Sequence, residues 1–118
     1  MFKMHPMPSD HTVMQWKLEI WCFVPLDPNT MKLVGTTIEE QTKRVLDNLS
    51  IVLAGVGLSL QNIVKTTVYL KNMSDFQGMN KIYEEMFQGH KPCRTTISIK
   101  QNPLDALVEI ECIAELQT

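Results

Sequence analysis

Arg94 and two glutamates are the residues of this sequence whose types and order could carry chemistry together. Arg94 opens a predicted strand directly after Pro92 and Cys93, and Glu109 and Glu111 lie on the polar face of the last predicted strand. A guanidinium can bind a carboxylate through two parallel hydrogen bonds, and a carboxylate at the same end of a sheet can position or deprotonate a water molecule. Taken alone, these residue types favour the plainer interpretation that all three are solvated or ion-paired, and the catalytic hypothesis stays open beside it.

Metal and phosphate chemistry find little support in the sequence. His5 and His11 stand six residues apart without a carboxylate or cysteine at ligand spacing, and His90 follows a glycine in a predicted loop, so we expect no metal site. The Gly55-Val56-Gly57 run ends a helical pattern instead of linking a strand to the start of a helix. It therefore does not predict a phosphate-binding loop.

Length and composition indicate one domain over residues 1–118 in a chain of 118 residues and 13.5 kDa. The net charge of −2 and the isoelectric point of about 5.9 lack the basic footprint of nucleic-acid binding. No apolar run approaches the roughly 20 residues of a membrane span, so we expect a cytoplasmic protein without membrane contact. Three cysteines without C-x-x-C spacing are expected to be reduced thiols: Cys22, Cys93 and Cys112.

The first half of the chain predicts an irregular start, strand and helix. Residues 1–8 show no periodicity, residues 12–24 mix β-branched and aromatic types as one or two strands do, and residues 25–30 carry the proline and Asx residues of a turn. A capping box at residues 37–40 opens a helix whose apolar residues recur every three or four positions up to Val56, and Gly57 supplies a left-handed end.

The second half predicts a strand, a helix and two further strands. Residues 62–71 alternate as a half-buried strand does, and Ser74 with Asp75 opens a helix that Gly89 and Pro92 end. Residues 95–100 and 107–116 are the last two strands. This order predicts an α+β domain with both helices on one face of a mixed sheet.

The last strand has two unlike faces. Apolar or small residues at alternate positions from Val108 to Leu116 point toward the helices, while Glu109, Glu111 and Glu115 point the other way. The second face of the sheet is then bare, and sister subunits are the simplest cover for it. We therefore expect a homo-oligomer.

Several motifs in order along the chain, from about Pro25 to the C-terminus, resemble those of one family. They include the Thr37–Leu49 helix start, the Ile63–Leu70 strand, Pro92-Cys93-Arg94-Thr95-Thr96 and Val108–Ala114. The sequence closely resembles the Rid or YjgF-like reactive-intermediate deaminases, also called L-PSP endoribonucleases.

The resemblance implies a chorismate-mutase-like fold assembled as a homotrimer, with three ligand clefts between subunits. Deaminases of this family hydrolyse 2-imino or enamine acids to 2-keto acids and ammonia without a cofactor. Their carboxylate-gripping arginine corresponds to Arg94, their water-positioning glutamate to Glu109 and their helix-borne asparagine to Asn80. Thr96 stands where many members have cysteine, and Glu111 is the weaker of the two glutamate candidates.

The N-terminal part departs from the family pattern. The usual Ser-Gly-Gln positions hold Trp21, Cys22 and Phe23, the usual tyrosine position falls on Pro8, and no tyrosine precedes Tyr69. The indole of Trp21 either fills part of the pocket and excludes larger ligands or simply packs in the sheet or at the subunit contact. A trimer that binds small carboxylates without turnover is therefore an alternative function, and an endoribonuclease or translation inhibitor is a less favoured one.

Overall fold

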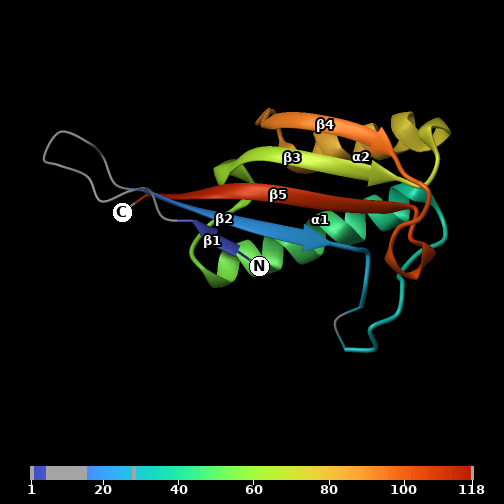
Figure 1. The fold of residues 1–118 in the computed structure, drawn as a ribbon, viewed down its shortest axis with the longest axis horizontal. Coiled ribbons are helices and arrows are strands. Elements are labelled where there is room, and N and C mark those ends of the chain that lie inside the picture. The colour runs from blue at the N-terminus through green and yellow to red at the C-terminus, as the bar shows by residue number, and fades with distance from the viewer. Residues whose placement is uncertain (1, 5–15, 28, 118) are drawn as a thin grey trace, which may run out of the picture.

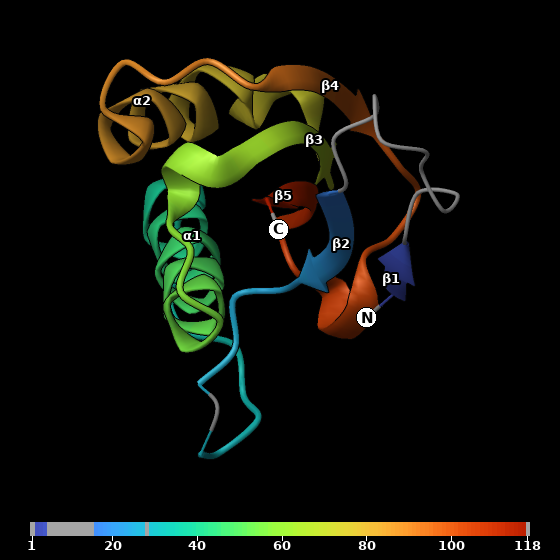
Figure 2. The same ribbon diagram turned by 90° about the vertical axis from the view of Figure 1, so that its left-hand side faces the viewer.

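One mixed sheet carries both helices on the same face (Figure 1, Figure 2). A computed structural model describes residues 2–4, 16–27 and 29–117, with side chains for residues 23–27 and 29–115. In that part of the chain, five strands run in the order β1-β2-β5-β3-β4, and only the β3–β4 pair is parallel. The strands are β1 (Phe2–Met4), β2 (Trp16–Phe23), β3 (Ile63–Leu70), β4 (Cys93–Ser98) and β5 (Val108–Gln117).

Helix α1 (Ile38–Gly55) begins and ends as the sequence predicts. The Thr37 hydroxyl accepts a hydrogen bond from the backbone N–H of Glu40, and the Glu40 carboxylate accepts one from the backbone N–H of Thr37. At the other end Gly57 has φ +79°, and the next backbone N–H returns to the carbonyl of Leu53 at 2.8 Å. A capping box and a left-handed glycine cap therefore bound the helix.

The core lies between the helices and the central strands β3 and β5. Side chains that face the helices, such as Val68 and Ile110, are fully buried, while their strand neighbours Tyr69 and Glu109 are only half-buried. Helix α2 (Phe76–Phe87) closes this layer beside α1. The predicted α+β arrangement, with two helices on one face of a mixed sheet, is confirmed. Within the described residues, no helix combines the length and apolarity that crossing a bilayer requires.

Three local predictions need correction. Residues 1–8 were expected to be irregular, but Phe2–Met4 forms β1 through pairing with β2, a non-local interaction that three residues cannot signal by periodicity. Strand β4 begins at Cys93, two residues before the predicted start, because its parallel pairing with β3 already holds Cys93 opposite Lys65. A 3-10 turn over Met73–Asp75 precedes α2, and the Asp75 side chain makes no capping hydrogen bond.

The close crossing of α1 and α2 predicts that two glycine-to-alanine substitutions change the free energy of unfolding in opposite directions. A Cβ atom at Gly78 would lie 2.7 Å from Cγ2 of Ile38, whereas one at Gly55 would meet nothing within 4 Å. Because the branched Ile38 side chain is buried and stiff, Gly78→Ala should lower the free energy of unfolding by about 1–3 kcal/mol. Gly55→Ala should raise it by up to about 1 kcal/mol through helix propensity. Urea unfolding at one fixed protein concentration measures both, and equal changes in the two variants would contradict the close crossing.

Candidate functional site

Helix α2 holds the guanidinium of Arg94 from one side. Arg94 pairs with Thr66 across β4 and β3, so its side chain leaves the sheet on the face that the helices cover. Its Nη1 donates a hydrogen bond to Oδ1 of Asn80 at 2.6 Å. The guanidinium carbon lies 5.4 Å from the ring centroid of Phe76 and 4.7 Å from that of Tyr83. Positions 76, 80 and 83 share one helical face, so a single stretch of helix fixes the direction of the cation.

Tyr83 is itself locked to the sheet. Its hydroxyl and Oγ1 of Thr66 form a buried hydrogen bond at 2.7 Å, and its ring lies 4.4 Å from that of Phe87. Burial raises the pKa of the Tyr83 phenol above the ordinary value of 10.0, although the hydrogen bond with Thr66 and the charge of Arg94 act in the opposite direction. The phenol therefore stays neutral beneath Arg94 at physiological pH.

Hydrogen bonds at both the oxygen and the nitrogen orient the side-chain amide of Asn80. Its Oδ1 accepts from Arg94, and its Nδ2 donates to Oε1 of Glu84 at 3.3 Å, one helical turn further along α2. Because the amide nitrogen cannot accept a hydrogen bond, the Glu84 carboxylate favours the orientation that presents the carbonyl oxygen to Arg94. One nitrogen of the guanidinium is thus committed to Asn80.

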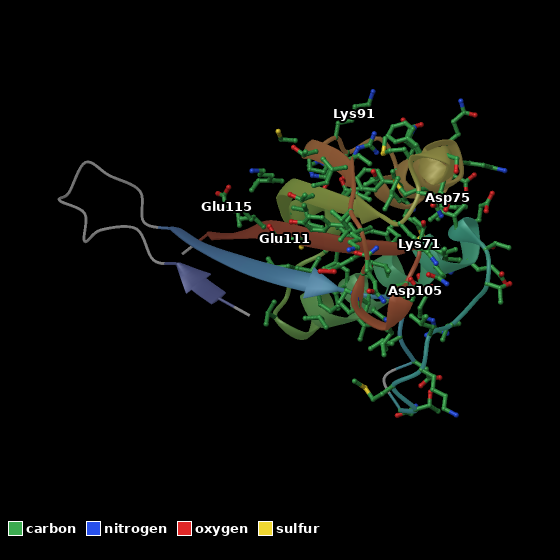
Figure 3. All side chains as sticks on the ribbon, turned by 45° about the vertical axis from the view of Figure 1, so that its right-hand side comes forward. Lys71, Asp75, Lys91, Asp105, Glu111 and Glu115 are labelled. Atoms are coloured by element: carbon green, nitrogen blue, oxygen red, sulfur yellow. The ribbon has the colours of Figure 1, made fainter. Side chains whose placement is uncertain are left out.

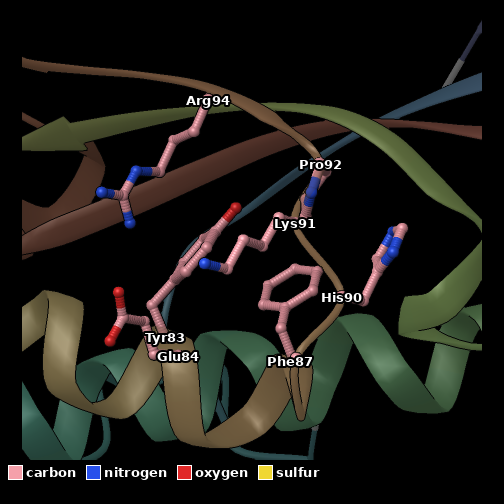
Figure 4. Close-up of a pocket in the computed structure, with 8 residues that line it drawn as sticks. Tyr83, Glu84, Phe87, His90, Lys91, Pro92 and Arg94 are labelled. Atoms are coloured by element: carbon pink, nitrogen blue, oxygen red, sulfur yellow. The ribbon is translucent and has the colours of Figure 1, made fainter.

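A hollow of about 430 Å³ opens beside Arg94, between α2 and the loop that leads into β4 (Figure 4). Its volume lies in the range of small-molecule sites, roughly 300–1,000 Å³. Arg94 and Lys91 bring positive charge to the lining, Glu84 brings negative charge, and two aromatic rings form an apolar wall. The lining residues are Tyr83, Glu84, Phe87, Gly89, His90, Lys91, Pro92 and Arg94.

Glu109 lies on the other face of the sheet. It pairs with Tyr69 on β3, between two positions whose side chains are buried under the helices. Glu111 (Figure 3) pairs with Thr67, and the alternation of side chains along β5 places it on the same open face as Glu109. Within one chain, neither glutamate can meet the guanidinium of Arg94, which lies on the helix side.

The two remaining site candidates are Thr96 and Trp21. Thr96 pairs with Val68 and shares the face of Arg94, and its buried Oγ1 has no hydrogen-bond partner in the described chain. The backbone of Trp21 pairs with Cys112, but its side chain lies outside the described residues, as does any role in filling a pocket. Among the described residues, no three histidine, cysteine or acidic side chains gather as metal ligands would.

The structure adds three residues to the site that the sequence did not single out as site residues: Tyr83, Glu84 and Lys91. The spacing of an aromatic residue, an asparagine and a second aromatic residue at positions 76, 80 and 83 was the available signal. It indicates a polar group held between two rings on one helical face.

The raised pKa of Tyr83 predicts a loss of stability in alkali. The unfolded chain releases this proton near the ordinary tyrosine value while the folded chain still holds it, so stability present below about pH 10 is lost as the pH rises. Tyr83→Phe removes this titration and should flatten the decline in the free energy of unfolding between about pH 9 and 11. Urea unfolding of both proteins across that range measures the difference, and parallel declines would show that Tyr83 ionises normally.

Comparison with known proteins places this arrangement in a family. The sequence profile of the Endoribonuclease L-PSP family matches residues 22–116. A RutC family protein of Pyrococcus abyssi is 45% identical over 91 residues, which cover 77% of this chain and 72% of that protein. The chloroplastic Reactive Intermediate Deaminase A of Arabidopsis thaliana is 41% identical over 77% of this chain and 49% of its own length.

Solved structures agree with the sequence match. The YjgF gene product of E. coli has a TM-score of 0.75 at 31% identity, covering 84% of this chain and 79% of that one. E. coli TdcF with bound serine has a TM-score of 0.75 at 26% identity, covering 93% and 85%. The matched profile spans most of the chain and the fold agrees with that of the YjgF gene product, so this chain belongs to the Rid/YjgF family, whose profile is named Endoribonuclease L-PSP.

Proposed function

We propose that this protein hydrolyses small reactive 2-imino acids to 2-keto acids and ammonia, in clefts between the subunits of a homotrimer. Arg94 of one copy binds the carboxylate and Glu109 of the neighbouring copy directs the water. The observation that carries the proposal is the guanidinium of Arg94, fixed by Asn80 and two rings at the wall of a small hollow. The name of the Arabidopsis relative supports the reaction, and the serine in TdcF supports a small amino-acid-like ligand.

Arg94 is prepared to bind a carboxylate before the ligand arrives. Its Nη1 is held by Asn80, and contact with two rings restricts the plane of the guanidinium. The remaining N–H groups can donate to a carboxylate, and the rigid cation loses little conformational entropy when it does so. Arg94 thereby fixes the imine carbon relative to the water.

The reaction needs orientation and one directed water, because an iminium carbon is already electrophilic. Water adds to C2 as Glu109 accepts one of its protons, and the C=N π electrons move onto nitrogen. Glu109 returns that proton to the amino nitrogen of the resulting carbinolamine. It then accepts the proton of the hydroxyl as the C=O bond forms, the C–N bond breaks and ammonia leaves. One imino acid and one water give one keto acid and one ammonia, without any oxidant or reductant.

Two copies must contribute to one site because the sheet separates its two key residues. Arg94 lies on the helix side and Glu109 on the open side of the same sheet. Ile97 shares that open face with Tyr69, and its side chain is 41% exposed in one chain. Burial of this face against neighbouring copies would cover apolar surface and bring Glu109 of one copy toward Arg94 of another.

A trimer that binds carboxylates without turnover is the second candidate. Glu109 of the same chain does not line the Arg94 hollow. A carboxylate could therefore be held there without a water-directing group. Turnover distinguishes the two functions, because both predict binding.

Single substitutions test the roles of Arg94 and Glu109. With 2-iminobutanoate generated by a threonine dehydratase and semicarbazide as competitor, Glu109→Gln should lower kcat by about 10²–10⁴, because an amide cannot accept the proton of water. Arg94→Lys should mainly raise KM, because an ammonium cannot form the two parallel hydrogen bonds. The exposed Glu85 on α2 provides the matched control, Glu85→Gln, which should behave as wild type. No hydrolysis by wild type, together with 2-oxobutanoate binding, would replace this proposal with the binding function.

Mixed assembly tests whether two chains share a site. Arg94→Ala and Glu109→Gln homo-oligomers should each be inactive, but co-refolded mixtures should recover about a quarter of wild-type activity, since random neighbours pair the two intact residues at that frequency. Sedimentation of the mixture verifies assembly. A mixture that assembles as trimers yet stays inactive would mean that each chain supplies its own site.

A further inference from the structure

We propose that Lys91 binds a second carboxylate in the Arg94 hollow, so that the site prefers dicarboxylic imino and keto acids. This inference deepens the proposed function and rests on it for the reaction, while the binding preference can be measured without turnover. Lys91 and Arg94 line the same hollow from the loop after α2 and from the start of β4.

The loop around Lys91 is held in place on both sides. Gln88 and Gly89 leave α2 in left-handed conformations, with φ +52° and +90°. Nε2 of His90 then lies 2.7 Å from the carbonyl oxygen of Ile63 on β3, so the ring ties the loop to the sheet. Pro92 restricts the backbone on the other side. The backbone that carries Lys91 is therefore fixed relative to the hollow, and the side chain extends into it, toward α2 (Figure 4).

The charges around the hollow leave Lys91 available to a ligand. Among the described residues that line the hollow, Glu84 is the one carboxylate, and its Oε1 accepts a hydrogen bond from Asn80. Among the described residues, Lys91 has no hydrogen-bond or ion-pair partner. Two cationic side chains against one engaged carboxylate give the lining an excess of positive charge. An anion with a single carboxylate satisfies Arg94 and leaves the Lys91 ammonium to water.

The wall between the two cations is apolar. Tyr83 and Phe87 are buried in the helix layer and present two adjacent, mutually tilted rings to the hollow, with centroids 4.4 Å apart. A short methylene chain suits such a wall, and a carboxylate at each end of it suits Arg94 and Lys91. The matching ligands are keto and imino acids with four or five carbons and a second carboxylate, of which 2-oxoglutarate is a stable example.

Calorimetry with two stable keto acids tests the preference. Wild type should bind 2-oxoglutarate about tenfold more tightly than 2-oxobutanoate, the effect of one additional charge-assisted contact. Lys91→Met should reduce this ratio to about one to two, and Lys91→Arg should keep most of it, since the positive charge remains. Lys81→Met removes an exposed lysine of α2 that does not line the hollow, and should leave the ratio at its wild-type value.

Three results would overturn the inference. The first is equal affinity of wild type for the two acids, and the second is binding of neither acid. The third is a preference for 2-oxoglutarate that Lys81→Met weakens as much as Lys91→Met does, which would indicate general electrostatic attraction. Hydrolysis of 2-iminobutanoate is measured separately, so loss of the proposed activity and loss of the dicarboxylate preference are distinguishable.

Discussion

The burial of one sheet face under α1 and α2 is the interaction on which the rest of this structure depends. Side chains of β3 and β5 alternate between this face and the open one, and the helix-facing positions are fully buried. That burial supplies most of the driving force for folding, and it also fixes the register of the strands, because a slip by one residue would turn the apolar set outward. The same choice of face places Arg94 on the helix side of the sheet and Glu109 on the open side.

Arg94 shows how a buried layer can present a charged group at its edge. It stands on the edge strand β4, where the helix-facing side is only partly covered, and α2 reaches it with two rings and an amide. The cation is stabilised without being desolvated on all sides, so the energetic cost of burial stays small. The same helix face that packs the core therefore also orients the group that would meet a carboxylate.

The alternation of side chains along a strand, which puts Arg94 on the helix side of the sheet, puts Glu109 on the opposite side. Its neighbours on β5 anchor the core, and this places its own carboxylate on the open face. A chemistry that uses both Arg94 and Glu109 then depends on assembly, since no rearrangement of side chains moves one of them through the sheet. The proposed reaction therefore requires the proposed oligomer. Residues of a single chain already form the hollow around Lys91 and Arg94.

The sequence by itself determined the helices, the central strands and the two faces of β5, because capping residues and apolar periodicity act over a few positions along the chain. It also placed Arg94 and Asn80 in the candidate site through their motifs, and these two residues do form a hydrogen bond. Only the tertiary structure decided that Tyr83 and Lys91 belong with Arg94 and that Glu109 lies across the sheet from it. Strand pairing, the helix crossing and the path of a loop join residues that are distant in sequence, and no local pattern encodes those distances.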